Sequence, residues 1–276
     1  MPIHPTMTPG AIAVVTGAAS GIGRAAAERL SAEGLTVALI DLPGEKPSAA
    51  ASAIPNARAY PADVADGAAM LALASQIRAD LGEPQVLMNN AGIGPGSSCL
   101  GDTEAWDRTL AVNLWGPIHG CRAFVPLMIG SGRPGLVINT GSKQGITTPP
   151  GNPAYNVSKA GVKVYTEALQ HELRNTPGCA VTAHLLIPGF VFTGMTSGAT
   201  EKPPGAWTPA QTIDFMMESL SRGDFYILCP DNDVTRAIDE KRIAWAAGDI
   251  VENRPPLSRW HPDFKAAFAD WLASPS

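Results

Sequence analysis

The chain has 276 residues, of which 45% are hydrophobic and only 16% are charged, and its formal net charge at neutral pH is −5. A chain of this length buries about 70–75% of its unfolded surface, so its core needs no disulfide or metal. The acidic balance and the lack of long lysine or arginine runs argue against nucleic acid or a membrane surface as a partner. Ordinary domains carry about 25% charged residues, and one explanation of the deficit is that a cofactor, a substrate or a second subunit covers much of the surface.

The N-terminus and the cysteines indicate the compartment. The first ten residues hold no Lys or Arg and no long apolar stretch, so we expect no secretory signal. The apolar runs are too short to span a membrane. The four cysteines lack the spacing of metal sites, so we expect free thiols, no metal and a cytoplasmic protein. They are Cys99, Cys121, Cys179 and Cys229.

Apolar runs of strand length alternate with helical patterns along most of the chain. Strands are expected over residues 11–16, 35–40, 57–61, 86–88, 136–140, 181–187 and 225–229. Helices are expected over residues 22–32, 65–81, 103–130, 154–174 and 208–221, with Pro117 as a break or kink. Continuous apolar strands between helices indicate an α/β fold, a Rossmann-like, doubly wound parallel sheet of about seven strands with helices on both faces.

We expect a single domain over residues 1–276, with a core at 10–229 and a C-terminal extension at 230–276. Residues 190–222 would form a substrate loop and helix, and 190–207 have no clear period, which indicates a mobile loop. The extension is rich in aromatic residues. It either packs on its own subunit or covers the active site or a partner subunit. The aromatic residues are Trp245, Trp260, Phe264, Phe268 and Trp271.

A glycine-rich turn, Thr16-Gly17-Ala18-Ala19-Ser20-Gly21-Ile22-Gly23, follows the first predicted strand and opens the first helix. Gly17 permits the tight turn, Gly21 lets the backbone approach a pyrophosphate, and Gly23 allows close packing of helix on strand. The helix N-terminus offers backbone N–H groups and a positive dipole end to the phosphates. A plain structural turn is the alternative, but this position favours a dinucleotide site.

Asp41 ends the second predicted strand. A carboxylate at this place accepts hydrogen bonds from the adenosine ribose hydroxyls and repels a 2′-phosphate. Neither Ser20 nor Leu42 supplies the cation that a 2′-phosphate needs. The pattern therefore favours NAD over NADP, with a simple turn residue as the alternative for Asp41.

Tyr155 and Lys159 are four residues apart near the start of a predicted helix and share one face. A nearby ammonium group lowers the pKa of a phenol and makes it usable as an acid or base near neutral pH. An exposed helical pair is the alternative. Ser142 directly follows a predicted strand, where side chains face the ligand crevice, and its hydroxyl can hydrogen-bond a substrate oxygen.

These residues together resemble a classical short-chain dehydrogenase/reductase over roughly residues 10–229. The matching motifs are Thr16-Gly17-x-x-x-Gly21-x-Gly23, Asp63, Asn89-Asn90-Ala91-Gly92, Asn113, Ser142, Tyr155-x-x-x-Lys159 and Pro188-Gly189 with Thr193. The resemblance implies that Tyr155 is the general acid/base, that Lys159 holds the nicotinamide ribose, and that Ser142 polarises the substrate oxygen. It implies that Asn113 holds a water that relays protons from Lys159.

The resemblance also implies a full set of cofactor contacts. Asp63 and Val64 would bracket the adenine, and the segment after Pro188 would meet the nicotinamide. The implied cofactor-binding residues are Gly17, Ser20, Gly21, Ile22, Gly23, Asp41, Leu42, Asp63, Val64, Asn90, Ala91, Gly92, Tyr155, Lys159, Pro188, Gly189 and Thr193. The alternative for Asn113 is an amide satisfied within its own helix, and for Asn89-Asn90 a turn that stabilises the sheet.

Two departures from the family pattern stand out. Lys143 follows Ser142 and would either contact a polar substrate group or lie in solvent. The usual Asp-Gly-Gly turn after the last strand is replaced by Pro230-Asp231-Asn232-Asp233, which puts the standard packing of the tail in a tetramer in doubt.

The candidate pocket wall is largely apolar and predicts a hydrophobic or aromatic secondary alcohol and its ketone as substrate and product. Its candidates, by position in the family pattern, are Ser142, Gly94, Ile146, Thr147, Phe190, Phe192, Met195 and Trp207. Residues 124–135 are similar to members that oxidise bulky aryl alcohols. The alternatives are a ketone reductase, a sugar or steroid dehydrogenase, or a non-catalytic nucleotide sensor. The resemblance implies a homodimer or homotetramer that pairs the helices of residues 103–130 and 154–174.

Overall fold

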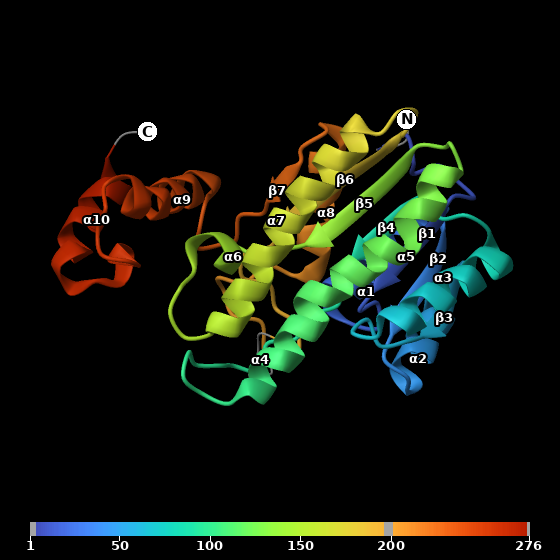
Figure 1. Cartoon of the computed structure of the whole chain (residues 1–276), viewed down its shortest axis with the longest axis horizontal. Helices are drawn as coiled ribbons and strands as arrows, with labels where there is room; N and C mark the ends of the chain where they lie inside the picture. The colour runs from blue at the N-terminus through green and yellow to red at the C-terminus, as the bar shows by residue number, and fades with distance from the viewer. Residues whose placement is uncertain (1–3, 196–200, 275–276) are drawn as a thin grey trace.

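The structure is a computed structural model that describes residues 4–195 and 201–274. Within these residues, seven parallel strands form one sheet in the order β3-β2-β1-β4-β5-β6-β7 (Figure 1). The strands are β1 (Ile12–Thr16), β2 (Thr36–Asp41), β3 (Ala57–Pro61), β4 (Val86–Asn89), β5 (Gly135–Thr140), β6 (Val181–Ile187) and β7 (Tyr226–Leu228). The central strands are buried on both faces, which explains their continuous apolar runs and confirms the expected doubly wound α/β fold.

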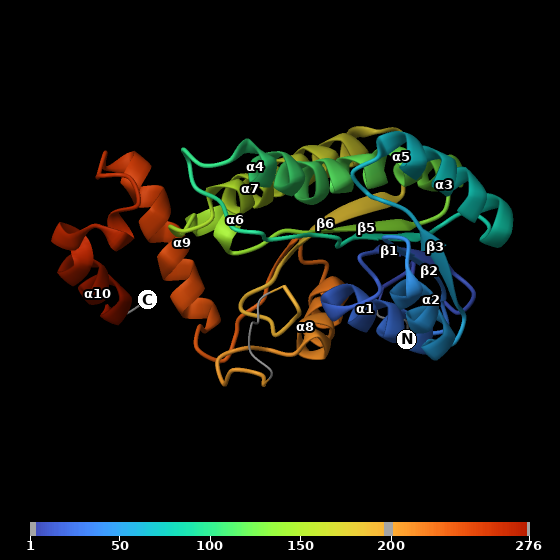
Figure 2. The ribbon, with the colours of Figure 1, turned by 90° about the horizontal axis from the view of Figure 1, so that it is seen from below.

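Helices cover both faces of the sheet (Figure 2). One face carries α1 (Gly21–Ala32), α2 (Glu45–Ala53) and α8 (Pro209–Ser221), whose apolar residues share a core cluster with the strands. The other face carries α3 (Gly67–Leu81), α4 (Thr103–Leu110), α5 (Gly116–Gly130) and α7 (Pro153–Asn175). The short α6 (Gln144–Thr147) packs against α7. No helix among the described residues is long and apolar enough to cross a membrane.

The helix expected over residues 103–130 forms as three consecutive helical segments in the structure. A π-helical turn, η1 (Ala111–Trp115), separates α4 from α5. Pro117 lies in the first turn of α5, directly after the π-helical turn, and has no N–H to donate to that turn. The irregularity predicted at Pro117 therefore lies one turn earlier.

The loop expected over residues 190–207 is ordered at both of its ends. Val191 pairs with Trp207 in a short parallel bridge. The N–H of Phe192 donates to the Trp207 carbonyl at 2.9 Å, and the Trp207 N–H donates to the Phe190 carbonyl at 2.9 Å. Residues 196–200 within this loop lie outside the described residues. The two ends of this loop are therefore paired with each other, and its mobility stays a prediction.

The extension forms α9 (Arg236–Val251), two single 3₁₀ turns and α10 (Lys265–Ala273). These helices stand at one end of the molecule, beyond α6 (Figures 1 and 2). Trp245 is buried, its indole N–H donates to Ser258 Oγ at 2.7 Å, and its ring meets Phe268 edge-on at 5.2 Å. The aromatic residues thus build a small core of their own, and α9 contacts the rest of the chain at α6.

Candidate active site

A cleft of about 900 Å³ opens at the carboxyl ends of the strands. It lies where the strand order reverses between β1 and β4, the usual ligand crevice of a doubly wound sheet. Its lining includes most residues predicted for the cofactor: Gly17, Ser20, Gly21, Ile22, Asp41, Leu42, Asp63, Val64, Asn90, Ala91, Gly92, Tyr155, Lys159, Pro188, Gly189 and Thr193. Gly23 and Asn113 lie behind the wall and support it.

The glycine-rich turn is tightly packed against the segment after β4. A Cβ at Gly23 would lie 2.3 Å from the Gly17 carbonyl oxygen, and one at Gly17 would lie 2.8 Å from Ala91 Cα. Thr16 Oγ1 accepts the N–H groups of Asn90 at 2.9 Å and Ala91 at 3.1 Å. Only hydrogen fits at these two positions, so the turn is a shaped cradle open toward the cleft and fits a dinucleotide.

Asp41 holds the turn as well as facing the cleft. Its carboxylate accepts the N–H of Ala19 at 2.9 Å and the N–H of Leu42 at 2.9 Å. Lys46, on the first turn of α2, lines the same cleft and was missed from the sequence. Helix α2 carries Pro47 and a run of small residues and has little helical pattern, so no sequence pattern indicates that it brings a cation here.

Asn89 stabilises the sheet rather than the cleft. Its amide donates to Asn139 Oδ1 at 2.8 Å, and the Asn139 amide donates to Thr166 Oγ1 at 3.0 Å. This buried chain ties β4 and β5 to α7. Asn90 does line the cleft, so the two neighbouring asparagines have different places.

Asn113 lies in the π-helical turn and is fully buried. Its amide oxygen accepts the N–H of Ile93 at 2.8 Å, and its amide nitrogen donates to the Ile93 carbonyl at 2.8 Å and to Ser158 Oγ at 3.3 Å. The side chain therefore fixes the backbone of the cleft wall and is not satisfied within its own helix. Such π turns occur often at functional sites.

Tyr155, Ser142 and Lys159 meet in the cleft. Asn152 begins α7 and accepts the Tyr155 N–H, which fixes where the phenol projects. Lys159 Nζ lies 5.7 Å from the centre of the Tyr155 ring and donates to the Thr140 carbonyl at 2.8 Å. The three groups thus present a phenol, a hydroxyl and an ammonium to one place at the strand ends.

Burial dominates the acid–base properties of this pair. Burial lowers the pKa of Lys159 from 10.5 to about 8. Burial also raises the pKa of Tyr155, and a hydrogen bond with Ser142 partly opposes this. In the chain alone, the ammonium group does not bring the phenol pKa below its ordinary value, which differs from the sequence-based expectation. Desolvation is the largest cause of this shift, because a buried phenolate loses its hydration.

The predicted substrate residues separate into two groups. Ser142, Gly94 and Met195 line the cleft, whereas the others do not. Ile146 packs beside the small core under α7, and the Trp207 ring packs near Phe215. The residues outside the lining are Ile146, Thr147, Phe190, Phe192 and Trp207. Residues that the sequence did not single out also line this end, namely Ile93, Pro95, Arg108, Ala111, Val112 and Val191.

Lys143 differs from both sequence-based expectations. Its side chain is 17% exposed and is not part of the cleft lining. Its ammonium group instead lies between two buried carboxylates, Asp231 and Asp239. These partners are about 90 residues away in sequence, so no local pattern could have indicated them.

This sheet order and this cleft place the protein in the doubly wound α/β class. The sequence profile described as short chain dehydrogenase matches residues 11–204. The chain belongs to the short-chain dehydrogenase/reductase family.

Two curated relatives illustrate the match. The chain is 33% identical over 244 residues to 1-deoxy-11-beta-hydroxypentalenate dehydrogenase of Streptomyces avermitilis, covering 84% of this chain and 89% of that protein. It is 36% identical over 260 residues to the probable oxidoreductase EphD of Mycobacterium tuberculosis. That alignment covers 92% of this chain but only 41% of EphD.

Two solved structures show the same fold with different cofactors. A short-chain dehydrogenase/reductase from Burkholderia phymatum in complex with NAD superposes with a TM-score of 0.81 and 30% identity, covering 91% of this chain and 97% of that one. A metagenomic short-chain oxidoreductase in complex with NADP gives a TM-score of 0.67 and 29% identity, covering 81% and 98%. The family therefore includes relatives with either cofactor.

Proposed function

We propose that this protein is an NAD-dependent oxidoreductase that transfers hydride between nicotinamide and a secondary alcohol or its ketone. The observation that carries the proposal is the meeting of Tyr155, Ser142 and Lys159 in one cleft with the glycine-rich cradle. A phenol, a hydroxyl and an ammonium beside a dinucleotide site form a set suited to moving one proton while hydride moves to or from the cofactor.

Each of the three side chains would act at a stated atom. Tyr155 would take the proton of the substrate hydroxyl in oxidation and return it in reduction, and Ser142 Oγ would hydrogen-bond the same oxygen. Lys159 would hold the nicotinamide ribose and, through Asn113, exchange protons with solvent. When bound, the oxidised nicotinamide supplies the hydride acceptor and a positive charge, which favours the phenolate of Tyr155 that burial disfavours.

The cofactor is proposed to be NAD on the strength of Asp41. This carboxylate stands at the end of β2 and lines the cleft where the adenosine ribose would lie. A 2′-phosphate would meet a fixed negative charge there. The ammonium group of Lys46, on α2, would instead attract a 2′-phosphate. The ratio of the activities with NAD and NADP therefore measures whether Asp41 or Lys46 has the larger effect on cofactor choice.

The substrate is proposed to be hydrophobic or aromatic. Ile93, Pro95 and Met195 give the cleft an apolar wall beside Tyr155, and the loop and helix of residues 190–222 would complete the pocket. Arg108 also lines the cleft, and its guanidinium would favour a substrate that carries a carboxylate or ketone beyond the reacting carbon. Ketone reduction and a sugar or steroid substrate are outcomes of the same assay.

We also propose an oligomeric state and a compartment. Trp115, Val157 and Val164 are about half exposed on the helices that the family pairs between subunits, which supports a homodimer or homotetramer. The four cysteines are unpaired, which supports a reducing compartment such as the cytoplasm.

The substitution Tyr155→Phe tests the proposed role most simply. Removing only the hydroxyl should lower kcat by about 100- to 10,000-fold, the usual contribution of general acid–base catalysis. NADH affinity should stay almost unchanged, because the ring and Lys159 remain. Turnover is measured with the fastest alcohol of a panel, and NADH binding by its fluorescence. Retained turnover would remove Tyr155 as the proton donor.

A further inference from the structure

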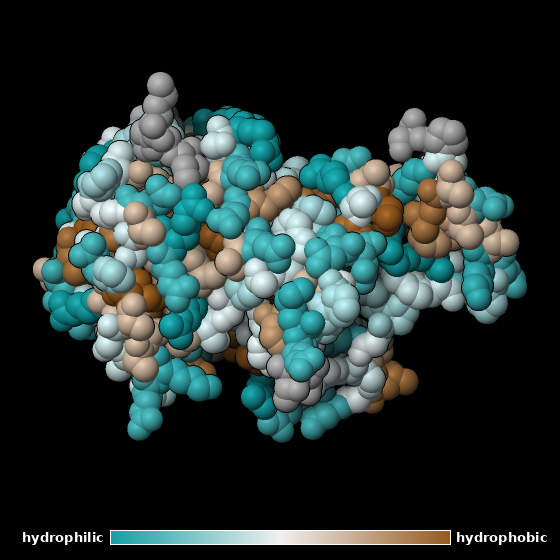
Figure 3. Space-filling model, turned by 180° about the vertical axis from the view of Figure 1, so that it is seen from behind, coloured by the Kyte–Doolittle hydropathy of each residue, from teal (hydrophilic) through white to brown (hydrophobic). Residues whose placement is uncertain are grey.

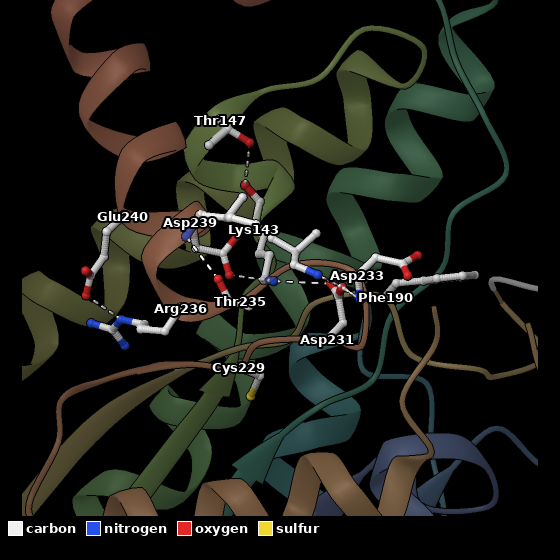
Figure 4. A network of polar contacts seen from close by, with 12 residues as sticks. Lys143, Thr147, Phe190, Cys229, Asp231, Asp233, Thr235, Arg236, Asp239 and Glu240 are labelled. Carbon is white, nitrogen blue, oxygen red and sulfur yellow. Dashed lines mark hydrogen bonds and ion pairs between the residues drawn. The ribbon is translucent and has the colours of Figure 1, made fainter. Parts of the chain in front are cut away.

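Lys143 is the centre of a buried ion-pair cluster that lies outside the cleft (Figure 4). Its Nζ lies 2.6 Å from Asp239 Oδ2 and 3.3 Å from Asp231 Oδ2. The two carboxylate side chains are only 5% and 6% exposed. We call Lys143, Asp231 and Asp239 the ion-pair cluster.

The three members come from segments that are far apart in the sequence. Lys143 directly follows Ser142 and begins α6, Asp231 lies in the turn after β7, and Asp239 lies in the first turns of α9. The cluster therefore joins the segment of the catalytic hydroxyl to the C-terminal extension.

Asp231 also holds the loop that faces the nicotinamide side of the cleft. Its Oδ2 accepts the N–H of Phe190 at 3.2 Å, and its Oδ1 accepts the N–H of Val234 at 2.8 Å. The Lys143 N–H donates to the Pro188 carbonyl at 3.4 Å. One carboxylate thus fixes its own turn and the residues directly after Pro188.

The same turn reaches the end of the substrate loop. The N–H of Asn232 donates to the Gly205 carbonyl at 3.2 Å, and its side-chain amide donates to the carbonyls of Pro204 and Ala206 at 2.6 and 3.2 Å. The turn that replaces the family's Asp-Gly-Gly pattern therefore joins Lys143, the residues after Pro188 and the end of the substrate loop.

A side chain at Gly189 would press directly on the ion-pair cluster. A Cβ there would lie 2.6 Å from Asp231 Oδ2 and 2.9 Å from Lys143 Nζ. Gly189 itself lines the cleft, so the ion pair lies directly behind the cleft wall. Burial raises the pKa of Asp239, and Lys143 and, to a lesser extent, Arg242 oppose this shift, so the lysine is the largest influence that favours the charged carboxylate.

We propose that the ion-pair cluster positions Ser142 and the Gly189–Phe190 segment for hydride transfer, and that helix α9 is through it a working part of the active site. Lys143 is then a positioning residue, because it acts through Ser142 and the cleft wall and does not touch the substrate. The inference rests on the proposed dehydrogenase function. Removing the lysine leaves two buried carboxylates facing each other, which repels helix α9 from the turn after β7 and releases residue 143 from both.

The test compares Lys143→Met, Asp239→Asn and the double variant with the wild-type full-length protein. We expect kcat for the alcohol to fall by about 10- to 100-fold in Lys143→Met, since small misplacements of reacting groups have effects of this size. NADH affinity should stay within about twofold, because the adenosine half of the site is untouched. The double variant should be no slower than Lys143→Met, because Asp239→Asn removes one of the orphaned charges.

Arg236→Gln is the matched control. Arg236 pairs with Glu240 at 2.7 Å on the same helix, but this pair is more than half exposed and lies apart from Lys143 (Figure 4). Its loss should leave kcat unchanged, since exposed pairs contribute little. If Arg236→Gln and Lys143→Met slow the enzyme equally, or Lys143→Met keeps full kcat, the proposal is overturned.

A second measurement does not depend on turnover. Amide hydrogen exchange should speed up in residues 142–147 and 188–192 of Lys143→Met, and not in the cradle at 17–23. Unchanged exchange in both loops would contradict the positioning role. If the wild-type protein turns over no alcohol or ketone, the proposed function fails, while hydrogen exchange still decides whether the cluster holds the two loops.

Discussion

At the scale of single residues, Lys159 shows how the fold prepares a group before any ligand binds. Its side chain is 4% exposed and its ammonium donates to the Thr140 carbonyl. Burial lowers its pKa to about 8, so near neutral pH it stays charged at a cost in stability. In the proposed mechanism, the same ammonium group would hold the cofactor ribose and stabilise the phenolate of Tyr155.

The stability cost of the buried Lys159 charge depends on pH and can be measured. Between pH 8 and 10.5 the unfolded chain keeps the Lys159 proton and the folded chain does not, so folding stability should rise with pH in this window. The variant Lys159→Met lacks this ammonium group and therefore lacks its contribution to the pH dependence. The difference in free energy of unfolding, wild type minus variant, should rise by about 2 kcal/mol from pH 7.5 to 10.

Urea unfolding of the cofactor-free proteins at several pH values measures this difference. Taking the difference removes the other groups that titrate in alkali, such as Tyr60, whose pKa burial raises to about 12. A difference that is flat with pH would mean that the ammonium is not desolvated in the fold.

At the scale of elements, the turn between β1 and α1 depends on the absence of side chains. Gly23 lies in the first turn of α1 against the Gly17 carbonyl, and Gly130 ends α5 with nothing within 4 Å of a Cβ. The two glycines are both helical but differ in the room around them. They therefore provide a matched pair.

We expect opposite effects of the same substitution. Gly23→Ala should lower the free energy of unfolding by about 1–3 kcal/mol, because its Cβ would force the turn apart. It should also weaken NADH binding, since the cradle is deformed. Gly130→Ala should raise stability by about 0.5–1 kcal/mol, because alanine is the better helix former. Equal effects of the two substitutions in urea unfolding would contradict the packing described for the cradle.

The elements that could be predicted from the sequence are those with strong periodicity. The strands and α1, α3, α7 and α8 carry buried apolar residues at regular spacing, and their bounds agree with the expected ranges within a few residues. Helix α2 was not predicted, since only Pro47 and Ala50 of its nine residues are buried. Its core-facing pattern is too short to detect.

The candidate site shows the same limit. Tyr155, Lys159 and Ser142 lie near one another in sequence and follow a recognisable motif, so they could be assigned. Lys46 reaches the cleft, and Asp231 and Asp239 reach Lys143, only through folding, so no spacing in the sequence predicts these contacts. The roles of Ile146, Phe190 and Trp207 rested on family position alone, and all three lie outside the cleft lining.

At the scale of the whole molecule, the extension is a small body with its own aromatic core. Arg254 stacks on Trp245 at 4.1 Å, and Ile250 and Val251 are 86% and 84% exposed. Seen from behind, apolar surface is scattered in patches over both the sheet domain and the extension, without one continuous band (Figure 3). The low charge of the chain thus reflects a buried sheet together with several exposed apolar patches.

Trp245→Ala should unfold the extension without unfolding the sheet. The cost is about 3–5 kcal/mol for a buried tryptophan, and the strands that form the main core all precede the extension. Limited proteolysis should then cut within residues 252–274 and leave a resistant fragment that contains the sheet. Trp260→Ala, at a half-exposed site, is the control and should change little. Loss of the whole fold in Trp245→Ala would show that the extension is part of one cooperative unit.

The most direct test of the account is whether the purified protein moves hydride from a secondary alcohol to NAD+. The protein is mixed with NAD+ or NADP+ and with aliphatic, aromatic, sugar and steroid alcohols labelled with deuterium at the carbinol carbon, and the absorbance of reduced nicotinamide is followed. We predict turnover with NAD+ faster than with NADP+, fastest for hydrophobic or aromatic alcohols, with the deuterium found on the nicotinamide ring. Silence across this panel, and with the matching ketones and NADH, would contradict the proposed function.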